Sequence, residues 1–290
     1  NTLNIRIMIT IRNLDFWYSK RENLFAGLNL DMQPGHIYGL LGKNGAGKTT
    51  LLKIMCGLFF PKRGEVFLDH WIPRQRHPGF LQDIFLLPEE IYIPLINAES
   101  LVRLYAPFYP RFSREQFTRA MDYFEVNSVR KLNKLSYGQK KKIMIAFALA
   151  CNTRYLFLDE PTNGLDIPSK ATFRSLLAAA FSEDRTIILS THQVRDLQSL
   201  IDHVLILSGR RIMIHQSLDF IGSRLKFQRS VTRTEMTGLL YSWNTEMGHA
   251  CILPNFDNEP GPVDIETLFN GALEVPEKIT HLLHSEIPVL

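Results

Sequence analysis

The sequence of 290 residues has few cysteines, little excess charge and no long hydrophobic run. Its three cysteines, Cys56, Cys151 and Cys251, lie far apart in apolar stretches. We therefore expect buried thiols in a reducing compartment rather than a disulfide framework. The net charge of +4 is mild, and the one short basic run, residues 140–142, suits a solvated helix start better than a nucleic-acid-binding patch. No nucleic-acid partner is expected.

The absence of a long apolar stretch limits how the chain can relate to a membrane. The longest uninterrupted apolar run, residues 143–151, covers nine residues, whereas a membrane-spanning helix needs about 20. We expect the chain neither to cross a membrane by itself nor to carry a secretory signal peptide. With 45% hydrophobic and 21% charged residues, it has the composition of a globular protein with a substantial core.

A glycine-rich segment, residues 39–50, contains the pattern Gly-x-x-x-x-Gly-Lys-Thr. Glycines let successive backbone N–H groups turn toward an anion, while the lysine reaches phosphates and the hydroxyl ligates Mg²⁺. The flanks predict a buried strand at residues 37–41 and a helix at 50–56 whose N-terminus faces the phosphates. A chance match in a glycine-rich turn would not need such flanks. The residues expected to contact the nucleotide here are Gly42, Lys43, Asn44, Gly45, Ala46, Gly47, Lys48, Thr49 and Thr50, with Thr49 also at the metal.

A second motif, residues 155–160, is an apolar run that ends in Asp159 and Glu160. A buried strand of this kind delivers Asp159 to the metal and leaves Glu160 where it polarises a water that attacks the γ-phosphate. The alternative is a strand end capped by two surface acids. The phosphate-binding pattern about 110 residues upstream favours the catalytic interpretation.

Strand-like and helix-like segments alternate along most of the chain, which predicts a doubly wound α/β fold. Strand patterns occupy residues 8–18, 24–32, 37–41, 64–68, 84–87, 154–158, 186–190, 204–207 and 211–215. Helical patterns occupy residues 50–56, 97–124 with breaks at Pro107 and Pro110, 135–150, 169–181 and 194–201. After about residue 222, short β-like pieces, a polar stretch at 255–262 and a final helix near 264–272 indicate a small appendage.

Residues 135–139, Leu-Ser-Tyr-Gly-Gln, stand 20 residues before the strand that ends in two acids. They resemble the signature Leu-Ser-Gly-Gly-Gln of the ATP-binding subunits of ABC (ATP-binding cassette) transporters, from which Tyr137 departs. The resemblance covers about residues 8–220. It implies that Ser136, Gly138 and Gln139 approach the γ-phosphate of an ATP bound to a partner subunit. Ser136 is also a good N-cap for the helix that follows, and helix N-termini favour anions.

The same resemblance implies roles for residues outside these motifs. Asp166, which closes residues 161–166, matches a loop that lies at the seam of the dimer. His192 follows an apolar strand and matches a histidine that contacts the γ-phosphate, so we expect it to act in catalysis. Tyr18 matches the aromatic residue that stacks on adenine. Phe16 and Trp17 are nearby alternatives, and a plain edge-strand aromatic is the other interpretation of Tyr18.

Glu89 departs from the family pattern, because this sequence has Leu-Pro-Glu at residues 87–89 where the family has Leu-Pro-Gln. The family's glutamine touches the metal and the attacking water. Glu89 still offers a hard oxygen ligand to Mg²⁺, although a negative charge beside a triphosphate raises its pKa or weakens its contact. The alternative is a surface acid that follows a proline. Gln82 lies seven residues too early to substitute.

As a whole, the resemblance implies a P-loop NTPase core with a mostly parallel sheet flanked by helices, an N-terminal antiparallel β subdomain and a helical signature subdomain at about residues 95–150. Residues 8–220 would form the ATP-binding domain, and residues 221–290 a small α+β appendage that is regulatory or stabilises the dimer. The implied cofactors are ATP and Mg²⁺.

The implied partners are a second ATPase subunit, identical or related, paired head to tail, and an integral-membrane permease on a separate chain. The permease would hold the subunit at the cytoplasmic face of the cell membrane. The alternative is a soluble ABC ATPase that acts on a nucleic-acid or protein assembly. Chromosome and repair types need a long coiled coil between Glu89 and Leu135, where only 45 residues intervene. A soluble assembly ATPase with one short cassette stays open.

Overall fold

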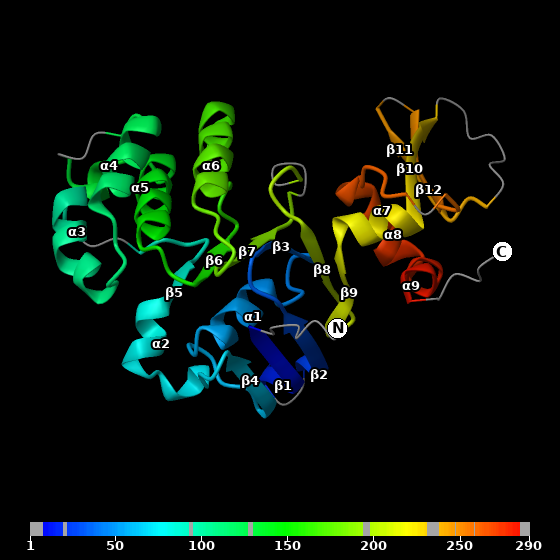
Figure 1. The fold of residues 1–290 in the computed structure, drawn as a ribbon, viewed down its shortest axis with the longest axis horizontal. Coiled ribbons are helices and arrows are strands. Elements are labelled where there is room, and N and C mark those ends of the chain that lie inside the picture. The colour runs from blue at the N-terminus through cyan, green and yellow to red at the C-terminus, as the bar shows by residue number, and fades with distance from the viewer. Residues whose placement is uncertain are drawn as a thin grey trace.

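The chain folds around a central six-stranded sheet (Figure 1). The computed structural model describes residues 8–19, 22–92, 95–126, 130–193, 198–230, 238–246, 248–257 and 259–284. The strand order is β5-β6-β7-β3-β8-β9. The bounds are β3 (His36–Leu41), β5 (Ile84–Leu87), β6 (Tyr155–Asp159), β7 (Thr186–Thr191), β8 (His203–Ser208) and β9 (Arg211–Ser217). Only the β8–β9 pairing within this sheet is antiparallel, which confirms the predicted mostly parallel sheet.

The middle strands of this sheet consist of buried residues. Every residue of β6 and β7 is buried, as expected when helices cover both faces of a parallel sheet. Because β3, β6 and β7 run in the same direction, their carboxyl ends meet at one edge of the sheet. The loops that leave this edge carry the phosphate-binding pattern and the two acids, so the topology brings distant motifs together.

A second, three-stranded sheet precedes the helical part of the chain, with the order β2-β1-β4. Its strands are β1 (Ile9–Ser19), β2 (Glu22–Met32) and β4 (Arg63–Leu68), and both pairings are antiparallel. Helix α1 (Lys48–Met55) shares one buried core with this sheet, in which Phe25 and Leu51 belong to the same cluster as Tyr155 of the central sheet. This core fixes the phosphate-binding loop between the two sheets.

The helical part of the chain lies at one end of the central sheet (Figure 1). It contains α3 (Ala98–Tyr105), α4 (Arg114–Tyr123) and α5 (Tyr137–Ala150), and α6 (Ile167–Ala179) follows β6. The predicted break between α3 and α4 is occupied by a 3-10 turn, Ala106–Phe108. The aromatic rings of Phe112, Phe117 and Phe147 pack together inside this helical part of the chain. Within the described part of the chain, none of the helices has the length and apolar character that crossing a bilayer requires.

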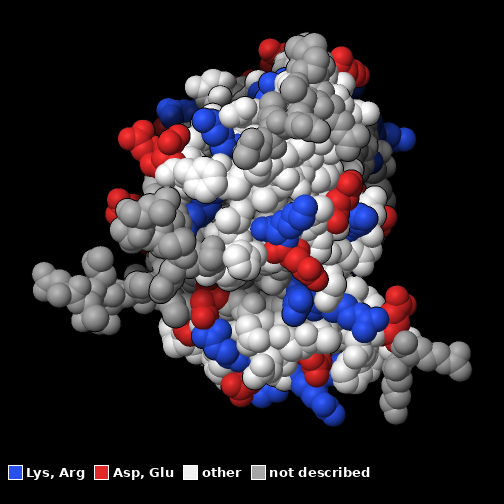
Figure 2. All heavy atoms as spheres, turned by 90° about the vertical axis from the view of Figure 1, so that its right-hand side faces the viewer, with Lys and Arg blue, Asp and Glu red and all other residues white. Residues whose placement is uncertain are grey.

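A third sheet, β10-β12-β11, lies at the other end of the molecule with three helices around it (Figure 1). Its elements are α7 (Leu218–Arg224), β10 (Leu225–Ser230), β11 (Tyr241–Thr245), β12 (Gly248–Pro254), α8 (Ile265–Glu274) and α9 (Pro276–His284). Figure 2 shows this side of the molecule, where described acidic and basic side chains are interspersed. We refer to residues 218–284 as the C-terminal region.

The structure differs from the expected elements in four places. Helix α2 (Pro78–Asp83), helix α7 and helix α9 were not predicted, and α9 follows the helix that was expected to be the last. A helix was predicted at residues 194–201, but residues 194–197 lie outside the described residues and 198–200 form a turn. The prediction of buried free thiols is confirmed, because all three cysteines are buried and unpaired.

Candidate functional site

A pocket of about 440 Å³ opens at the carboxyl edge of the central sheet. This volume lies within the range of small-molecule sites, ~300–1,000 Å³. The pocket is lined by Tyr18, Leu24, Lys43, Asn44, Gly45, Gly47, Lys48, Thr49, Thr50, Glu89, Glu160 and His192. Most of the residues predicted from separate motifs therefore meet in one place. Leu24 was not predicted, and no motif marks it.

The phosphate-binding loop joins β3 to α1, and two of its glycines have backbone angles that favour glycine. Gly45 and Gly47 have φ angles of 81° and 106°, which residues with a side chain rarely adopt. A Cβ atom on Gly47 would also lie 2.8 Å from the ring of Phe25. The loop is thereby held against the N-terminal sheet, and the N-terminus of α1 opens toward the pocket, an arrangement that favours an anion.

Lys48 is buried at the first position of α1. Its Nζ donates a hydrogen bond to the carbonyl of Gly42 at 2.8 Å and lies 3.8 Å from Glu160 Oε1. The ammonium group is therefore held inside the loop as a compact positive charge, where it can meet phosphate oxygens. Of the other loop residues, Gly42 and Ala46 lie outside the described pocket lining, and Gly42 acts through its carbonyl.

Thr49 and Asp159 supply oxygen atoms side by side. Thr49 Oγ1 donates to Asp159 Oδ2 at 2.6 Å, and Ser190 Oγ donates to the other oxygen of the same carboxylate. Asp159 is buried at the end of β6. A hydroxyl and a carboxylate are hard oxygen donors of the kind that bind Mg²⁺ beside nucleotide phosphates. The donor set fits this ion, and Ser190 is a supporting residue that the sequence did not single out.

Glu160 and His192 form a hydrogen-bonded pair at the pocket wall. His192 Nδ1 lies 2.8 Å from Glu160 Oε1, and the His192 amide donates to Oε2 at 3.4 Å. Glu160 is buried, whereas the His192 side chain is 38% exposed. Glu160 also has a φ of 46°, a strained backbone conformation of the kind that clusters at functional sites. A carboxylate held between a lysine and a histidine can orient a water molecule.

Tyr18 lies at the rim of the pocket and is 67% exposed. Its hydroxyl hydrogen-bonds with Thr50 Oγ1 at 2.6 Å, which ties the end of β1 to the start of α1. The ring stands edge-on to Phe16 and Phe59, at centroid distances of 5.1 and 5.9 Å. The outer face of the ring is open and can stack on a flat ligand. Trp17 offers no such face to the pocket, because it is absent from the described pocket lining.

Glu89 reaches the pocket from the end of β5. Its Oε1 accepts a hydrogen bond from Asn163 Nδ2 at 2.9 Å. Its backbone carbonyl accepts from Tyr137 Oη at 2.8 Å and from Lys141 Nζ at 3.4 Å. Glu89 is exposed, as the surface-acid alternative expects, but it also lines the pocket and is hydrogen-bonded to residues of two other segments, α5 and the loop after β6. Whether it ligates Mg²⁺ stays a prediction.

Lys141 is a site residue that sequence reasoning missed. Its side chain is buried in α5. Burial lowers its pKa to about 8, against the attraction of Glu89, Asp159 and Glu160. A basic run is usually solvated, so the run at residues 140–142 gave no sign that its central lysine points inward.

The signature residues lie outside the described lining of this pocket. Ser136 caps α5 by accepting from the Gln139 amide, and the Gln139 side chain accepts from the Ser136 amide, so the two form a capping box. A Cβ on Gly138 would lie 2.7 Å from the carbonyl of Gly164. Asp166 caps α6, and hydrogen bonds from Ser169 hold the pKa of its exposed carboxylate below the usual value.

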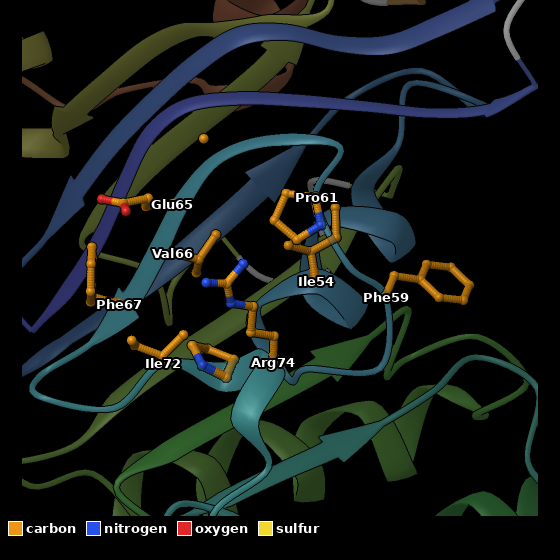
Figure 3. Close-up of a pocket in the computed structure, with 10 residues that line it drawn as sticks. Ile54, Phe59, Pro61, Glu65, Val66, Phe67, Ile72 and Arg74 are labelled. Atoms are coloured by element: carbon orange, nitrogen blue, oxygen red, sulfur yellow. The ribbon is translucent and has the colours of Figure 1, made fainter.

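A much smaller cavity lies between the C-terminal end of α1, β4 and residues 72–74 (Figure 3). Ile54 of α1, Val66 of β4 and Ile72 surround it. Its volume of about 30 Å³ has room for roughly one water molecule. It is therefore not a second nucleotide site.

Comparisons with known proteins agree with this geometry. Residues 25–163 match the family model described as ABC transporter. The chain is similar to the energy-coupling factor transporter ATP-binding protein EcfA1 of Thermotoga maritima, with 33% identity over 234 residues that cover 76% of this chain and 83% of that protein. It is also similar to the molybdate import ATP-binding protein MolC of Haemophilus influenzae, with 29% identity over 222 residues that cover 74% and 85%.

A solved structure shows the same fold. It is the dimeric structure of an ATP-binding cassette in a post-hydrolysis state bound to ADP and Pi. The TM-score is 0.63 at 22% identity, and the match covers 72% of this chain and 98% of that one. The predicted α/β fold with a mostly parallel sheet is thus confirmed.

Proposed function

The chain belongs to the ABC transporter family of ATP-binding proteins and is an ATPase, and from this premise we propose that it powers a membrane permease carried by a separate polypeptide. ATP with Mg²⁺ would bind in the pocket of each of two subunits paired head to tail. The chain would then be held at the cytoplasmic face of the membrane through its permease. The transporter names of the relatives, for import in one case, support this class of function.

In this proposal, Lys48 and the amides of the phosphate-binding loop hold the phosphates, and Tyr18 stacks on adenine. Thr49 and Asp159 would be the ligands from this chain for Mg²⁺, which would supply positive charge to neutralise the phosphates. Glu160 orients the attacking water and accepts its proton, and His192 holds the Glu160 carboxylate in place.

The observation that carries the dimer is the position of the signature residues. Ser136 and Gly138 lie at an exposed helix N-terminus outside the chain's own pocket. A helix N-terminus favours an anion, and in a head-to-tail pair it would face the γ-phosphate of the other subunit. Two identical composite sites would result.

Mixing two impaired variants tests the composite site. Lys48→Ala disables the pocket, and Ser136→Arg disables the signature. In a head-to-tail pair of one subunit of each kind, one site carries both defects and the other carries none. We expect the mixture to hydrolyse ATP faster than either variant does alone at the same total protein concentration. A mixture as inactive as its components would contradict composite sites.

The surface that supports a membrane partner is a groove of about 470 Å³ between α1, α2, β5 and α3. It presents exposed apolar side chains, with Leu58 at 47%, Tyr105 at 43% and Phe108 at 65% exposure. It also lies along β5, and Glu89 follows this strand in the chain. We propose that an amphipathic segment of the permease occupies this groove and that its movement reaches the pocket through Glu89.

The groove can be tested without disturbing the nucleotide site. Phe108→Asp should reduce co-purification of the chain with the membrane fraction and leave the ATPase activity of the purified chain unchanged. Phe256→Asp is the matched control, since Phe256 is 81% exposed in the C-terminal region. Equal membrane association of both variants would argue against the groove and leave the ATPase assignment intact.

A further inference from the structure

Two histidines and an aspartate meet at the edge of the central sheet that faces away from the nucleotide. His36 begins β3, while Asp202 and His203 lie at the start of β8. These strands are parallel neighbours, with Tyr38 opposite His203, so their amino ends lie together. The nucleotide pocket lies beyond the carboxyl ends of the same sheet. The length of a six-residue strand, roughly 20 Å, separates the two places.

The side chains of these residues converge. One potential ligand atom from each of His36, Asp202 and His203 lies within 4.8 Å of the other two. His36 Nδ1 is 2.7 Å from Asp202 Oδ2, and His203 Nδ1 is 3.4 Å from Asp202 Oδ1. The two imidazole rings have a centroid separation of 4.2 Å. Two nitrogen donors therefore flank one carboxylate.

One of these nitrogen atoms is buried without a hydrogen bond. His203 Nδ1 makes no well-formed hydrogen bond, although it lies 3.4 Å from Asp202 Oδ1. A buried polar atom without a partner costs free energy and calls for an explanation. A metal ion that accepts the imidazole lone pair would supply the missing interaction.

The carboxylate between the histidines is held by the backbone around it. Asp202 Oδ1 accepts from the Ile37 amide at 2.8 Å, and the Asp202 amide donates to the Ile37 carbonyl at 3.0 Å. The Asp202 carbonyl accepts from the Leu218 amide at 2.8 Å, at the start of α7. Such supporting hydrogen bonds orient a ligand before the metal arrives.

We propose that His36, Asp202 and His203 bind a divalent transition-metal ion of the zinc class. Two imidazoles and one carboxylate suit zinc, whereas Mg²⁺ and Ca²⁺ prefer oxygen donors alone. Three protein ligands leave a fourth position for water. The side chains of His36, Asp202 and His203 are 28%, 47% and 20% exposed, so an ion can reach the site from solvent.

The site has a structural consequence that is independent of ATP. It joins β3 to β8, and through Asp202 it touches the point where the ATPase core passes into the C-terminal region. An ion that binds the folded chain but not the unfolded chain raises the unfolding temperature by mass action. The bound ion therefore stabilises the junction of the two regions.

Titration with zinc chloride tests the proposal. The full chain is prepared without a histidine tag and is stripped of metal with a chelator. It carries the substitution Asp159→Asn, so that zinc bound at the nucleotide site does not contribute to the measured stoichiometry. We expect one equivalent of zinc to bind in the absence of nucleotide and to raise the unfolding temperature. His36→Ala and His203→Ala should each weaken zinc binding by about tenfold or more and abolish the rise in unfolding temperature.

Two comparisons keep the result decisive. His70→Ala, which removes an exposed histidine elsewhere on the surface, should bind zinc as the parent protein does. Magnesium chloride should not raise the unfolding temperature of this protein. Circular dichroism of the stripped variants shows whether they fold, and His36→Ala alters the more exposed of the two rings. Zinc binding that survives both histidine substitutions, no zinc binding by the parent, or an equal effect of magnesium would each overturn the proposal.

Discussion

The residues associated with ATP fall into two groups that differ in how the single chain holds them. Lys48, Asp159, Glu160 and His192 contact one another directly or through one intermediate residue around a single pocket. Ser136 and Asp166 instead cap their own helices and lie outside the described lining of that pocket. The first group is assembled within one subunit. The second group has satisfied local hydrogen bonds and, in the proposed mechanism, acts only on a partner. Substitutions in the two groups should therefore differ in their dependence on dimerisation.

The largest effect should come from Glu160→Gln. The amide keeps the shape of the side chain but loses the charge that accepts a proton, so we expect ATP turnover to fall by roughly 10²- to 10⁴-fold while ATP still binds. The ATP-bound dimer should accumulate, which gel filtration with ATP measures. Glu183→Gln, on an exposed loop, is the control. Near-normal turnover would remove Glu160 from the first group.

Lys48→Ala should weaken binding of ATP to the monomer. A hydrogen bond from a charged group is worth about 1.5–3 kcal/mol, so an affinity loss on the order of 10- to 100-fold is expected. Equilibrium binding of a fluorescent ATP analogue at low protein concentration measures it. Lys53→Ala, on the same helix but outside the described pocket lining, should bind normally. Wild-type affinity of the Lys48 variant would mean that ATP binds elsewhere.

Ser136→Arg should separate the groups most clearly. ATP binding by the monomer should stay unchanged, whereas the bulk of arginine at the seam should weaken the ATP-bound dimer by roughly tenfold, as overpacking does. Gel filtration in the Glu160→Gln background measures the dimer. Ser113→Arg is the matched control, because Ser113 caps α4 in the same way. This variant loses an N-cap worth about 1 kcal/mol but does not alter the proposed dimer interface. Equal dimer formation by both variants would refute a role across subunits.

The smallest effect is expected for Glu89→Gln. At about 4 Å a carboxylate and a phosphate oxygen repel by roughly 4 kcal/mol at an effective dielectric constant of 20, and Mg²⁺ between them offsets most of this. ATP affinity should therefore rise by about threefold at low Mg²⁺ and change little at saturating Mg²⁺. Titration of affinity against Mg²⁺ decides it, with Glu90→Gln as the control. Superimposable curves would show that the bond from Asn163 keeps Glu89 away from the ligand.

The sequence was sufficient to predict the elements whose residues are buried on every side. The strand predicted at residues 84–87 has the same bounds as β5. The strand predicted at 154–158 begins and ends one residue before β6, and the strand predicted at 186–190 ends one residue before β7. Apolar runs are unambiguous there because both faces of the sheet are covered. Helix α2 was missed because six residues that begin Pro-Gly carry no helical period. The strand order could not be read either, since pairing of distant segments leaves no local pattern.

The site could be predicted as a set of positions but not as a set of contacts. Motif spacing indicated Lys48, Asp159 and Glu160, which the structure brings together. The bond between Glu89 and Asn163 joins residues 74 positions apart and depends on how two loops pack. The Lys141 side chain points inward because of how α5 is rotated about its axis. The sequence of α5, apolar with three lysines near its start, does not specify this rotation.

The hydrogen bond from Tyr137 to the carbonyl of Glu89 gives the proposed dimer a further property. Glu89 lines the pocket of its own chain, whereas Tyr137 lies between Ser136 and Gly138, which in the proposed dimer would face the ATP of the other chain. In that dimer, each chain would carry a direct hydrogen-bonded link between the two sites. Thermodynamic linkage requires that the two ATP molecules change each other's binding affinity by the same factor. The Hill coefficient of nucleotide binding by the pair should accordingly depend on this hydroxyl and change in Tyr137→Phe.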